Sequence, residues 1–243
     1  MSKDGKRHIV ATSGGFVADR RGGWRVGPLI DHALALSGRN RPRVCYLGTA
    51  SGDQEWGTAY WYSAFAGHED VRPSHLRLFP MPNVDDPAKH LLEQDVIWVG
   101  GGSVANLLAV WKLHGIDDAM RAAWDAGVVL AGVSAGSLCW HVGGTTDSFG
   151  PDLRPVTNGL ALLPYGNGVH YDSEEQRRPL LHRLVADGTL PTSYATDDGV
   201  GLHYVDTELH ESLTSEDGKL GYVVERGDDG SVVETPLPTR FLG

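Results

Sequence analysis

The residues best suited to chemistry lie near the middle of the chain, in the segment Gly132-Val133-Ser134-Ala135-Gly136. The segment matches G-x-S-x-G, the nucleophile elbow, in which a sharp turn between a strand and a helix exposes a serine hydroxyl. Small neighbours let this strained turn close, and the first N–H groups of the helix are then available to stabilise an oxyanion. The pattern alone is equally typical of a plain glycine-rich turn, so its surroundings decide whether the serine is a nucleophile.

A serine at neutral pH needs a base within hydrogen-bond distance and an acid that orients this base. The chain holds eleven histidines. We favour His170 as the base, because it lies in the loop-like segment 167–172 ahead of an expected helix, and catalytic bases are common on such loops. His141 follows the serine turn too closely, and the surface of a helix is the default place for His182.

Two adjacent carboxylates, Asp197 and Asp198, follow an expected strand and precede Gly199. One of them could turn toward the imidazole and orient it, while the other meets solvent or caps the turn. The same three residues are equally typical of an Asp-Asp-Gly turn. The sequence therefore offers an orienting acid without deciding which aspartate provides it.

A triple glycine, Gly100-Gly101-Gly102, follows an expected buried strand at 96–99. Because parallel strands end at one edge of an open sheet, this loop is expected beside the serine turn. N–H groups from the loop and from Ala135 would then converge on one oxyanion. A phosphate site is disfavoured, since Ala105 replaces the last glycine of G-x-G-x-x-G and the chain has no P-loop Lys-Ser/Thr pair there.

The elements that must position these groups are strands and helices in alternation over the first 140 residues. This order predicts an α/β fold, a doubly wound and mostly parallel sheet with helices on both faces. Short strand-like runs separated by Gly/Asp turns follow residue 190 and predict a β-rich C-terminal extension, with a hairpin at 227–230. We expect residues 1–243 to form one domain.

Aromatic side chains gather on one expected helix: Trp56, Tyr60, Trp61, Tyr62 and Phe65. We expect them to pack this helix against the sheet, in preference to forming a platform for a ligand. Whether apolar residues such as Trp24, Trp56 and Trp61 belong to the core or to a homodimer interface is left open by the sequence.

Composition disfavours several classes of function. A formal net charge of −10 opposes nucleic-acid binding, which normally needs a basic face. No apolar run reaches the length of a membrane span, and residues 1–8 are polar and charged without the apolar segment of a secretory leader. The two cysteines, Cys45 and Cys139, form no C-x-x-C pair and are expected to be reduced thiols. We therefore expect a cytoplasmic protein with no nucleic-acid or membrane partner.

Taken together and in order, the triple glycine, the serine turn, Val169-His170-Tyr171 and Asp197-Asp198-Gly199 resemble the peptidase E family of serine peptidases. This family includes the cyanophycinases and has a class I glutamine-amidotransferase-like fold. The resemblance runs from about residue 8 to residue 204. It implies that Ser134 is the nucleophile, His170 the general base and Asp198 the third catalytic residue, with oxyanion donors at Gly102 and Ala135. It also implies no metal or organic cofactor, and a small peptide as substrate, in particular a dipeptide with N-terminal aspartate.

The chain departs from the family pattern in three places. Asp198 stands where the family usually has glutamate, and Ser103 stands where it commonly has asparagine, a position expected to contact substrate. The segment after His170 is also short. Recognition of an aspartate side chain needs a cation, for which Arg177 and Arg178 are the candidates. Both arginines are equally compatible with a helix surface on which they pair with nearby glutamates.

Two other functions remain open from the sequence. An α/β-hydrolase-type esterase would use the same serine, but its triad runs Ser, acid, His, so His203 or His210 would be the base. A non-catalytic amidotransferase-like module would keep the fold and bind a small ligand or a partner without a working relay.

Overall fold

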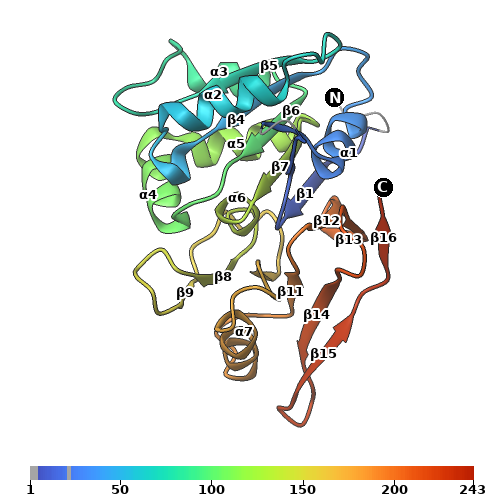
Figure 1. The fold of residues 1–243 in the computed structure, drawn as a ribbon. Helices are drawn as coiled ribbons and strands as arrows, with labels where there is room; N and C mark the ends of the chain where they lie inside the picture. Colours follow the sequence, from blue (N-terminus) through green and yellow to red (C-terminus); the bar gives the residue numbers. More distant parts are fainter. Residues whose placement is uncertain (1–4, 21–22) are drawn as a thin grey trace.

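The central element of the computed structural model, which describes residues 5–20 and 23–243, is a mixed eight-stranded sheet (Figure 1). Its strands, in spatial order, are β16 (Thr239–Phe241), β13 (Glu208–Thr214), β12 (Val200–Val205), β1 (His8–Thr12), β7 (Val129–Val133), β6 (Val96–Val99), β4 (Arg43–Leu47) and β5 (Arg72–Leu76). The five strands from β1 to β5 in this order run parallel, whereas β12 is antiparallel to β1. Residues 1–4, part of the stretch in which we expect no secretory leader, lie outside the described residues.

Helices cover both faces of this sheet, because its inner strands place apolar side chains alternately on the two faces. The helices of this part of the chain are α1 (Pro28–Leu36), α2 (Glu55–Ala64), α3 (Pro87–Leu92), α4 (Val104–His114), α5 (Ile116–Asp125) and α6 (Ala135–Leu138), with a 3-10 turn η1 (Thr49–Ser51). A further helix, α7 (Arg177–Ala186), belongs to the second sheet described below. Val10 and Trp98 pack with α1 and α2, while Ile9 and Ile97 pack with α3, α4 and α5. The predicted doubly wound, mostly parallel sheet is therefore confirmed.

A second sheet lies beyond the carboxyl ends of the parallel strands, below the first sheet in Figure 1. Its strands, in spatial order, are β15 (Val232–Pro236), β14 (Gly221–Arg226), β11 (Ser193–Thr196), β10 (Gly166–Gly168), β8 (Gly143–Thr146) and β9 (Arg154–Val156). Helix α7 packs on this sheet, and Leu181, Leu184 and Val224 belong to their shared core. The β-rich C-terminal region is thus present.

The second sheet begins earlier in the chain than the sequence indicated. Strands β8, β9 and β10 precede the expected extension, and they are short and rich in glycine and polar residues, so they lack the apolar alternation that marks a strand. Another unexpected element is a hairpin of β2 (Phe16–Ala18) and β3 (Trp24–Val26) between β1 and α1. Strands β8 to β10 and the β2–β3 hairpin are all short, and each is stabilised by the elements on which it packs more than by its own sequence pattern.

Two further expectations from the sequence concern the cysteines and the absence of a membrane span. Cys45 and Cys139 are buried and unpaired, and burial raises the pKa of the Cys45 thiol to about 12. Within the described part of the chain, no helix is long and apolar enough to cross a bilayer.

Candidate active site

Ser134 occupies a sharp turn between β7 and α6, as the elbow pattern predicts. Its backbone has φ 56° and ψ −112°, which for a residue with a side chain is a strained conformation costing about 1–3 kcal/mol. The Ser134 N–H donates to the carbonyl of Thr12 at 3.0 Å, and its own carbonyl accepts from Ser137 and Leu138. The turn is thus fixed on both sides, to β1 and to α6.

The two glycines of the elbow are required by close backbone contacts. A Cβ on Gly136 would lie 2.2 Å from the carbonyl oxygen of Val99, and a Cβ on Gly132 would lie 2.5 Å from the carbonyl oxygen of Gly136. No side chain fits at such distances. The two glycines of the G-x-S-x-G pattern are therefore required because α6 packs directly against the end of β6 and leaves no space for a side chain.

His170 and Asp198 come from two neighbouring parallel strands of the second sheet. Strands β10 and β11 are paired, with Gly168 opposite Ala195. After each of these strands the polypeptide continues into the site, where it carries His170 and Asp198 respectively. There Nδ1 of His170 lies 2.5 Å from Oδ1 of Asp198. His170 also has a positive φ, 53°, so its ring position is set by a constrained backbone.

Asp197 lies elsewhere. Its carboxylate is buried, accepts hydrogen bonds from the Leu220 N–H at 3.1 Å and the Tyr222 hydroxyl at 3.2 Å, and has a raised pKa because of burial. It therefore holds β11 to the start of β14. Of the two adjacent carboxylates, Asp198 is the one that contacts the imidazole.

Ser13, at the end of β1, connects the serine turn to the histidine loop. Its hydroxyl accepts from the backbone N–H of His170 at 3.1 Å and lies 2.6 Å from the hydroxyl of Thr196. Its neighbour Thr12 accepts from the Ser134 N–H. The two catalytic candidates are therefore anchored to adjacent residues, the last residue of β1 and the one that follows it. Within the described residues, the Ser134 hydroxyl itself makes no hydrogen bond.

The triple glycine lies against the serine, as expected from the sheet edge. A Cβ on Gly101 would lie 3.3 Å from Cβ and 3.8 Å from Oγ of Ser134, so Gly101 lies directly against the serine side chain. Gly102 has φ +133° and a Cβ there would meet the carbonyl oxygen of Ala50 at 2.4 Å. In the described part of the chain, no acceptor is hydrogen-bonded to the N–H groups of Gly102 and Ala135. The closeness of Gly101 is a feature that the sequence did not single out.

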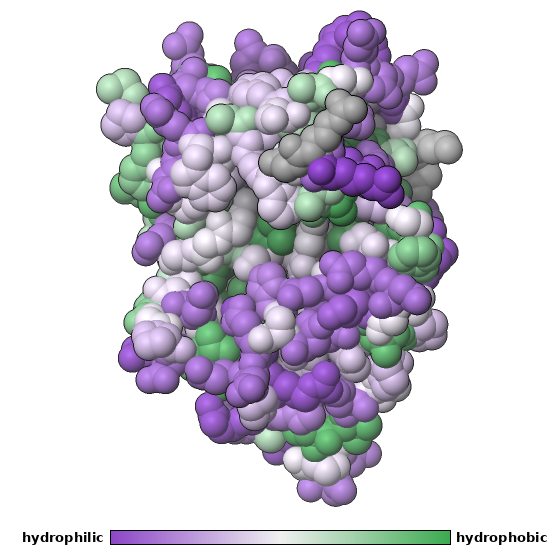
Figure 2. Space-filling model, in the orientation of Figure 1, coloured by the Kyte–Doolittle hydropathy of each residue, from purple (hydrophilic) through white to green (hydrophobic). Residues whose placement is uncertain are grey.

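A pocket of about 590 Å³ lies beside the serine turn, and its lining includes Val133, which precedes Ser134, and two residues of the triple glycine, Gly100 and Gly101. Its lining residues are mostly aromatic or small: Phe16, Trp24, Tyr46, Ser51, Trp56, Gly57, Tyr60, Trp61, Trp98, Gly100, Gly101 and Val133. In the space-filling view, this side of the molecule is hollowed between its upper and lower parts, with hydrophobic residues in the hollow (Figure 2).

The pocket corrects part of the expectation for the aromatic helix. Trp61 and Phe65 are buried against the sheet, as expected, but Trp56 is 63% exposed and lines the pocket together with Tyr60. The opposite wall comes from the unexpected hairpin β2–β3, whose Phe16 packs edge-on against Tyr60 with ring centroids 5.0 Å apart. The pocket could not be foreseen because its walls come from separate segments.

The expected substrate-binding residues are engaged in other contacts. Arg177 is only 2% exposed; it donates to Glu174 at 2.8 Å and to the carbonyl of Thr145, which corrects its expected place in a substrate site. Arg178 is paired with Glu234 and stacks over the rings of Tyr171 and Tyr222.

Ser103 is the N-cap of α4, and its hydroxyl accepts from the Asn106 N–H at 3.2 Å. This contact satisfies one of the free donors at the start of the helix. The helix cap therefore accounts for the serine at this position.

The histidines of the esterase alternative do not approach the serine turn. His203 lies on β12 within hydrogen-bond distance of His8 and His32, and His210 packs edge-on against His203. His141 is buried below the turn, where its Nδ1 lies 2.9 Å from the carbonyl of Ser137. Among the histidines considered for the base, His170 is the one hydrogen-bonded to Asp198.

Comparison with known proteins shows to which family the chain belongs. A model described as peptidase family S51 matches residues 9–212. The chain is 39% identical to the "Uncharacterized peptidase YgaJ" of Bacillus subtilis (strain 168) over 241 residues, 98% of this chain and 100% of that protein. It is 29% identical to "Peptidase E" of Shewanella denitrificans over 171 residues, 67% of this chain and 69% of that protein.

Two solved structures share the fold. A putative peptidase E protein from Listeria monocytogenes EGD-e superposes with a TM-score of 0.61, covering 87% of this chain and 100% of that chain at 14% identity. A peptidase from an acI-B1 Actinobacterium superposes with a TM-score of 0.67, covering 96% of this chain and 95% of that chain, also at 14% identity. The family match over most of the sequence and the 39% identity over nearly all of it lead to one conclusion: this chain belongs to peptidase family S51 and is a serine-type peptidase.

Proposed function

We propose that this peptidase hydrolyses small peptides by acyl transfer, with Ser134 as nucleophile, His170 as general base and Asp198 as the acid that orients the base. The observation that carries the proposal is the 2.5 Å hydrogen bond between Nδ1 of His170 and Oδ1 of Asp198, at the sheet edge where Ser134 is held at a positive φ. A strained serine and an oriented imidazole at one edge are the arrangement that acyl transfer requires.

The hydrogen bond to Asp198 assigns the roles of the two ring nitrogens of His170. When Nδ1 carries the proton that is donated to Asp198, Nε2 keeps a lone pair. Nε2 then accepts the proton of Ser134 as Oγ attacks the scissile carbonyl, and later gives it to the leaving amine. In this mechanism, Nε2 comes within hydrogen-bond distance of Oγ of Ser134 in the substrate complex, since catalytic hydrogen bonds often form fully only when substrate is bound.

The N–H groups of Gly102 and Ala135 are the proposed oxyanion donors. Both belong to loops that meet beside Ser134, and donors placed in advance stabilise the developing charge without reorganising. After the amine leaves, a water molecule deprotonated by His170 attacks the acyl-enzyme and releases the acid. This chemistry requires no metal ion or organic cofactor.

Preference for an N-terminal aspartate, which the resemblance implies, requires a cation beside the substrate side chain. Arg177 is buried with Glu174, and Arg178 is paired with Glu234. Among the described residues that line the pocket beside Gly101, there is no lysine or arginine. These observations favour a substrate whose N-terminal residue is not aspartate.

The aromatic pocket supports an apolar side chain instead. Burying a large apolar side chain in such a pocket contributes about 1.5–3 kcal/mol to binding. We therefore propose dipeptides and other short peptides with a large apolar or aromatic N-terminal residue as substrates, with Trp56 and Tyr60 as walls of the side-chain subsite.

A dipeptide panel varied at the N-terminal residue tests the mechanism and the specificity together, when measured on wild type, Ser134→Ala and Trp56→Ala. For wild type we expect the highest kcat/KM with phenylalanine, leucine or tyrosine. Ser134→Ala should lower kcat on the order of 10⁶-fold, because it removes the nucleophile. Trp56→Ala should lower kcat/KM for aromatic substrates by about 10- to 100-fold and leave alanyl dipeptides nearly unchanged.

The panel separates the two proposals. Near-normal hydrolysis by Ser134→Ala would reject the acyl-transfer mechanism, whatever the specificity. A wild type that cleaves aspartyl dipeptides best and depends on Ser134 would keep the mechanism and reject the apolar subsite. Tyr62→Ala is a matched control for Trp56→Ala, because Tyr62 lies on the same helix but not in the pocket lining.

A further inference from the structure

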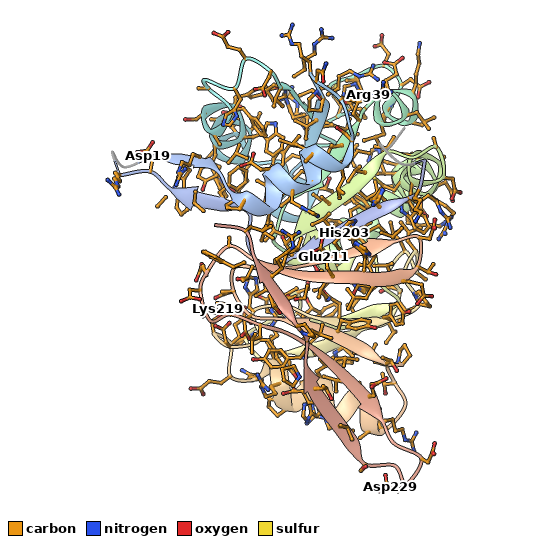
Figure 3. All side chains as sticks on the ribbon, turned by 90° about the vertical axis from the view of Figure 1, so that its right-hand side faces the viewer. Asp19, Arg39, His203, Glu211, Lys219 and Asp229 are labelled. Carbon is orange, nitrogen blue, oxygen red and sulfur yellow. The ribbon has the colours of Figure 1, made fainter. Side chains whose placement is uncertain are left out.

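Three side chains of metal-binding type converge from three separate elements, away from the serine turn. His32 comes from α1, His203 from β12 and Glu211 from β13. Figure 3 shows His203 and Glu211 side by side on neighbouring strands. Nε2 of His32 lies 3.3 Å from Nδ1 of His203, which lies 3.5 Å from Oε1 of Glu211. The distance from Nε2 of His32 to Oε1 of Glu211 is 3.9 Å.

These three separations match the dimensions of a transition-metal site. The point in the plane of the three atoms that is equidistant from them lies about 2.1 Å from each, which is the usual length of zinc–nitrogen and zinc–oxygen bonds. Two imidazoles and one carboxylate are also the ligand set of many three-ligand zinc sites, in which water takes the fourth position. The present side-chain positions therefore fit a metal ion without rearrangement of the backbone.

A second layer of contacts orients the ligands. Nδ1 of His8 lies 2.9 Å from Nε2 of His203. If this nitrogen of His203 donates to His8, the Nδ1 lone pair of His203 faces the other two ligand atoms, as outer partners do for metal-bound histidines. Arg240 holds the carboxylate of Glu211 with two hydrogen bonds, at 2.9 and 3.1 Å.

The cluster is largely shielded from solvent. His203 is only 3% exposed, while His32 and Glu211 are half-buried. The three ligand atoms are therefore held inside the fold and are not displayed on a flexible surface.

Access from solvent is provided by a cavity of about 540 Å³. His8, His32, His203, His210 and Glu211 are among its lining residues. The cavity has room for a water ligand at the open position, and an ion can reach the three atoms through it.

We propose that His32, His203 and Glu211 bind one divalent first-row transition-metal ion, for which zinc is the probe, and that the ion clamps α1 to the edge of the central sheet. One ligand atom comes from α1 and the other two from the β12–β13 hairpin, and His32 lies 171 positions before His203 in the chain. A bound ion would therefore cross-link two distant segments that meet only in the folded state. Such an ion stabilises the fold by mass action. The site is independent of the proposed peptidase chemistry.

Titration of zinc into the full-length protein, after treatment with a chelator, tests the proposal by calorimetry and by thermal unfolding. We expect one zinc ion per chain, and a rise in Tm of about 5–10 °C at a free zinc concentration 100 times Kd. His32→Ala and Glu211→Gln should each weaken binding at least 10-fold and remove most of the rise in Tm. Magnesium should have no effect, because the site offers two nitrogen ligands and too few oxygens.

Three control variants keep the result interpretable. His114→Ala removes an exposed histidine outside the cluster and should bind zinc as wild type does. His170→Ala should also bind normally; loss of binding in this variant but not in His32→Ala would place the ion at the catalytic pair and overturn the proposal. A wild type that neither binds zinc nor gains stability would mean a hydrogen-bonded histidine network only.

Discussion

At the scale of single residues, the proposed mechanism depends on which tautomer His170 adopts. Asp198 accepts from Nδ1 at 2.5 Å, and replacement by asparagine would leave the shape but allow the amide to donate to that nitrogen. The wrong tautomer would then face Ser134. We expect Asp198→Asn to lower kcat by about 10⁴-fold with little change in Tm, by analogy with other serine triads. Steady-state kinetics and thermal unfolding on the same samples measure both effects.

Asp197→Asn is the matched control at this scale. Asp197 is bonded to Leu220 and Tyr222 rather than to His170, so its replacement should alter stability more than turnover. Equal losses of kcat in the two variants would contradict the assignment of the acid to Asp198. Asp198→Glu, which restores the residue that is usual in the family, should retain far more activity than Asp198→Asn.

At the scale of elements, the active site depends on how closely α6 approaches the end of β6. A methyl group at residue 136 would lie 2.2 Å from the Val99 carbonyl oxygen, so the elbow would have to move. We expect Gly136→Ala to lower the free energy of unfolding by about 1–3 kcal/mol and to reduce kcat/KM through displacement of Ser134. Urea unfolding and dipeptide hydrolysis measure the two effects.

Gly23→Ala provides the comparison for this element-scale prediction. Among the described residues, the atom nearest to a Cβ on Gly23 would be Cβ of Asp19, at 3.9 Å, an ordinary van der Waals distance. The same change of residue should therefore cost little there. If Gly136→Ala proved as stable and active as Gly23→Ala, the elbow would be more tolerant than its packing indicates.

At the scale of the whole molecule, the core carries a histidine whose protonation opposes folding. His141 is fully buried, and burial lowers its pKa from 6.5 to about 4. The unfolded chain therefore binds a proton at a higher pH than the folded chain does. Stability from this group is complete above pH 6.5 and is lost as the pH falls toward 4; at pH 5 the loss is about 2 kcal/mol.

Urea unfolding at pH 7.5 and pH 5 measures this loss. His141→Gln, which cannot ionise in this range, should reduce the difference between the two pH values by about 2 kcal/mol. An unchanged difference in the variant would show that other groups cause the acid sensitivity. His114→Ala serves as the control, since its ring is exposed in the folded protein.

Features encoded within a few neighbouring residues could be predicted from the sequence. The alternation of strands and helices over the first 140 residues predicted the mostly parallel sheet, and the expected buried strand at 96–99 is β6. The G-x-S-x-G pattern predicted the turn at Ser134, because only small neighbours permit it. The ordered motifs also identified the family.

The tertiary structure alone decided the contacts between distant segments. It separated Asp198 from Asp197 through partners at Leu220 and Tyr222, and it placed Arg177 in the core rather than beside a substrate. It also built the aromatic pocket from a hairpin and a helix, and the cluster of His32, His203 and Glu211 from three elements. Local patterns carry no record of these contacts, because residues far apart in the chain meet only when the sheets and helices pack.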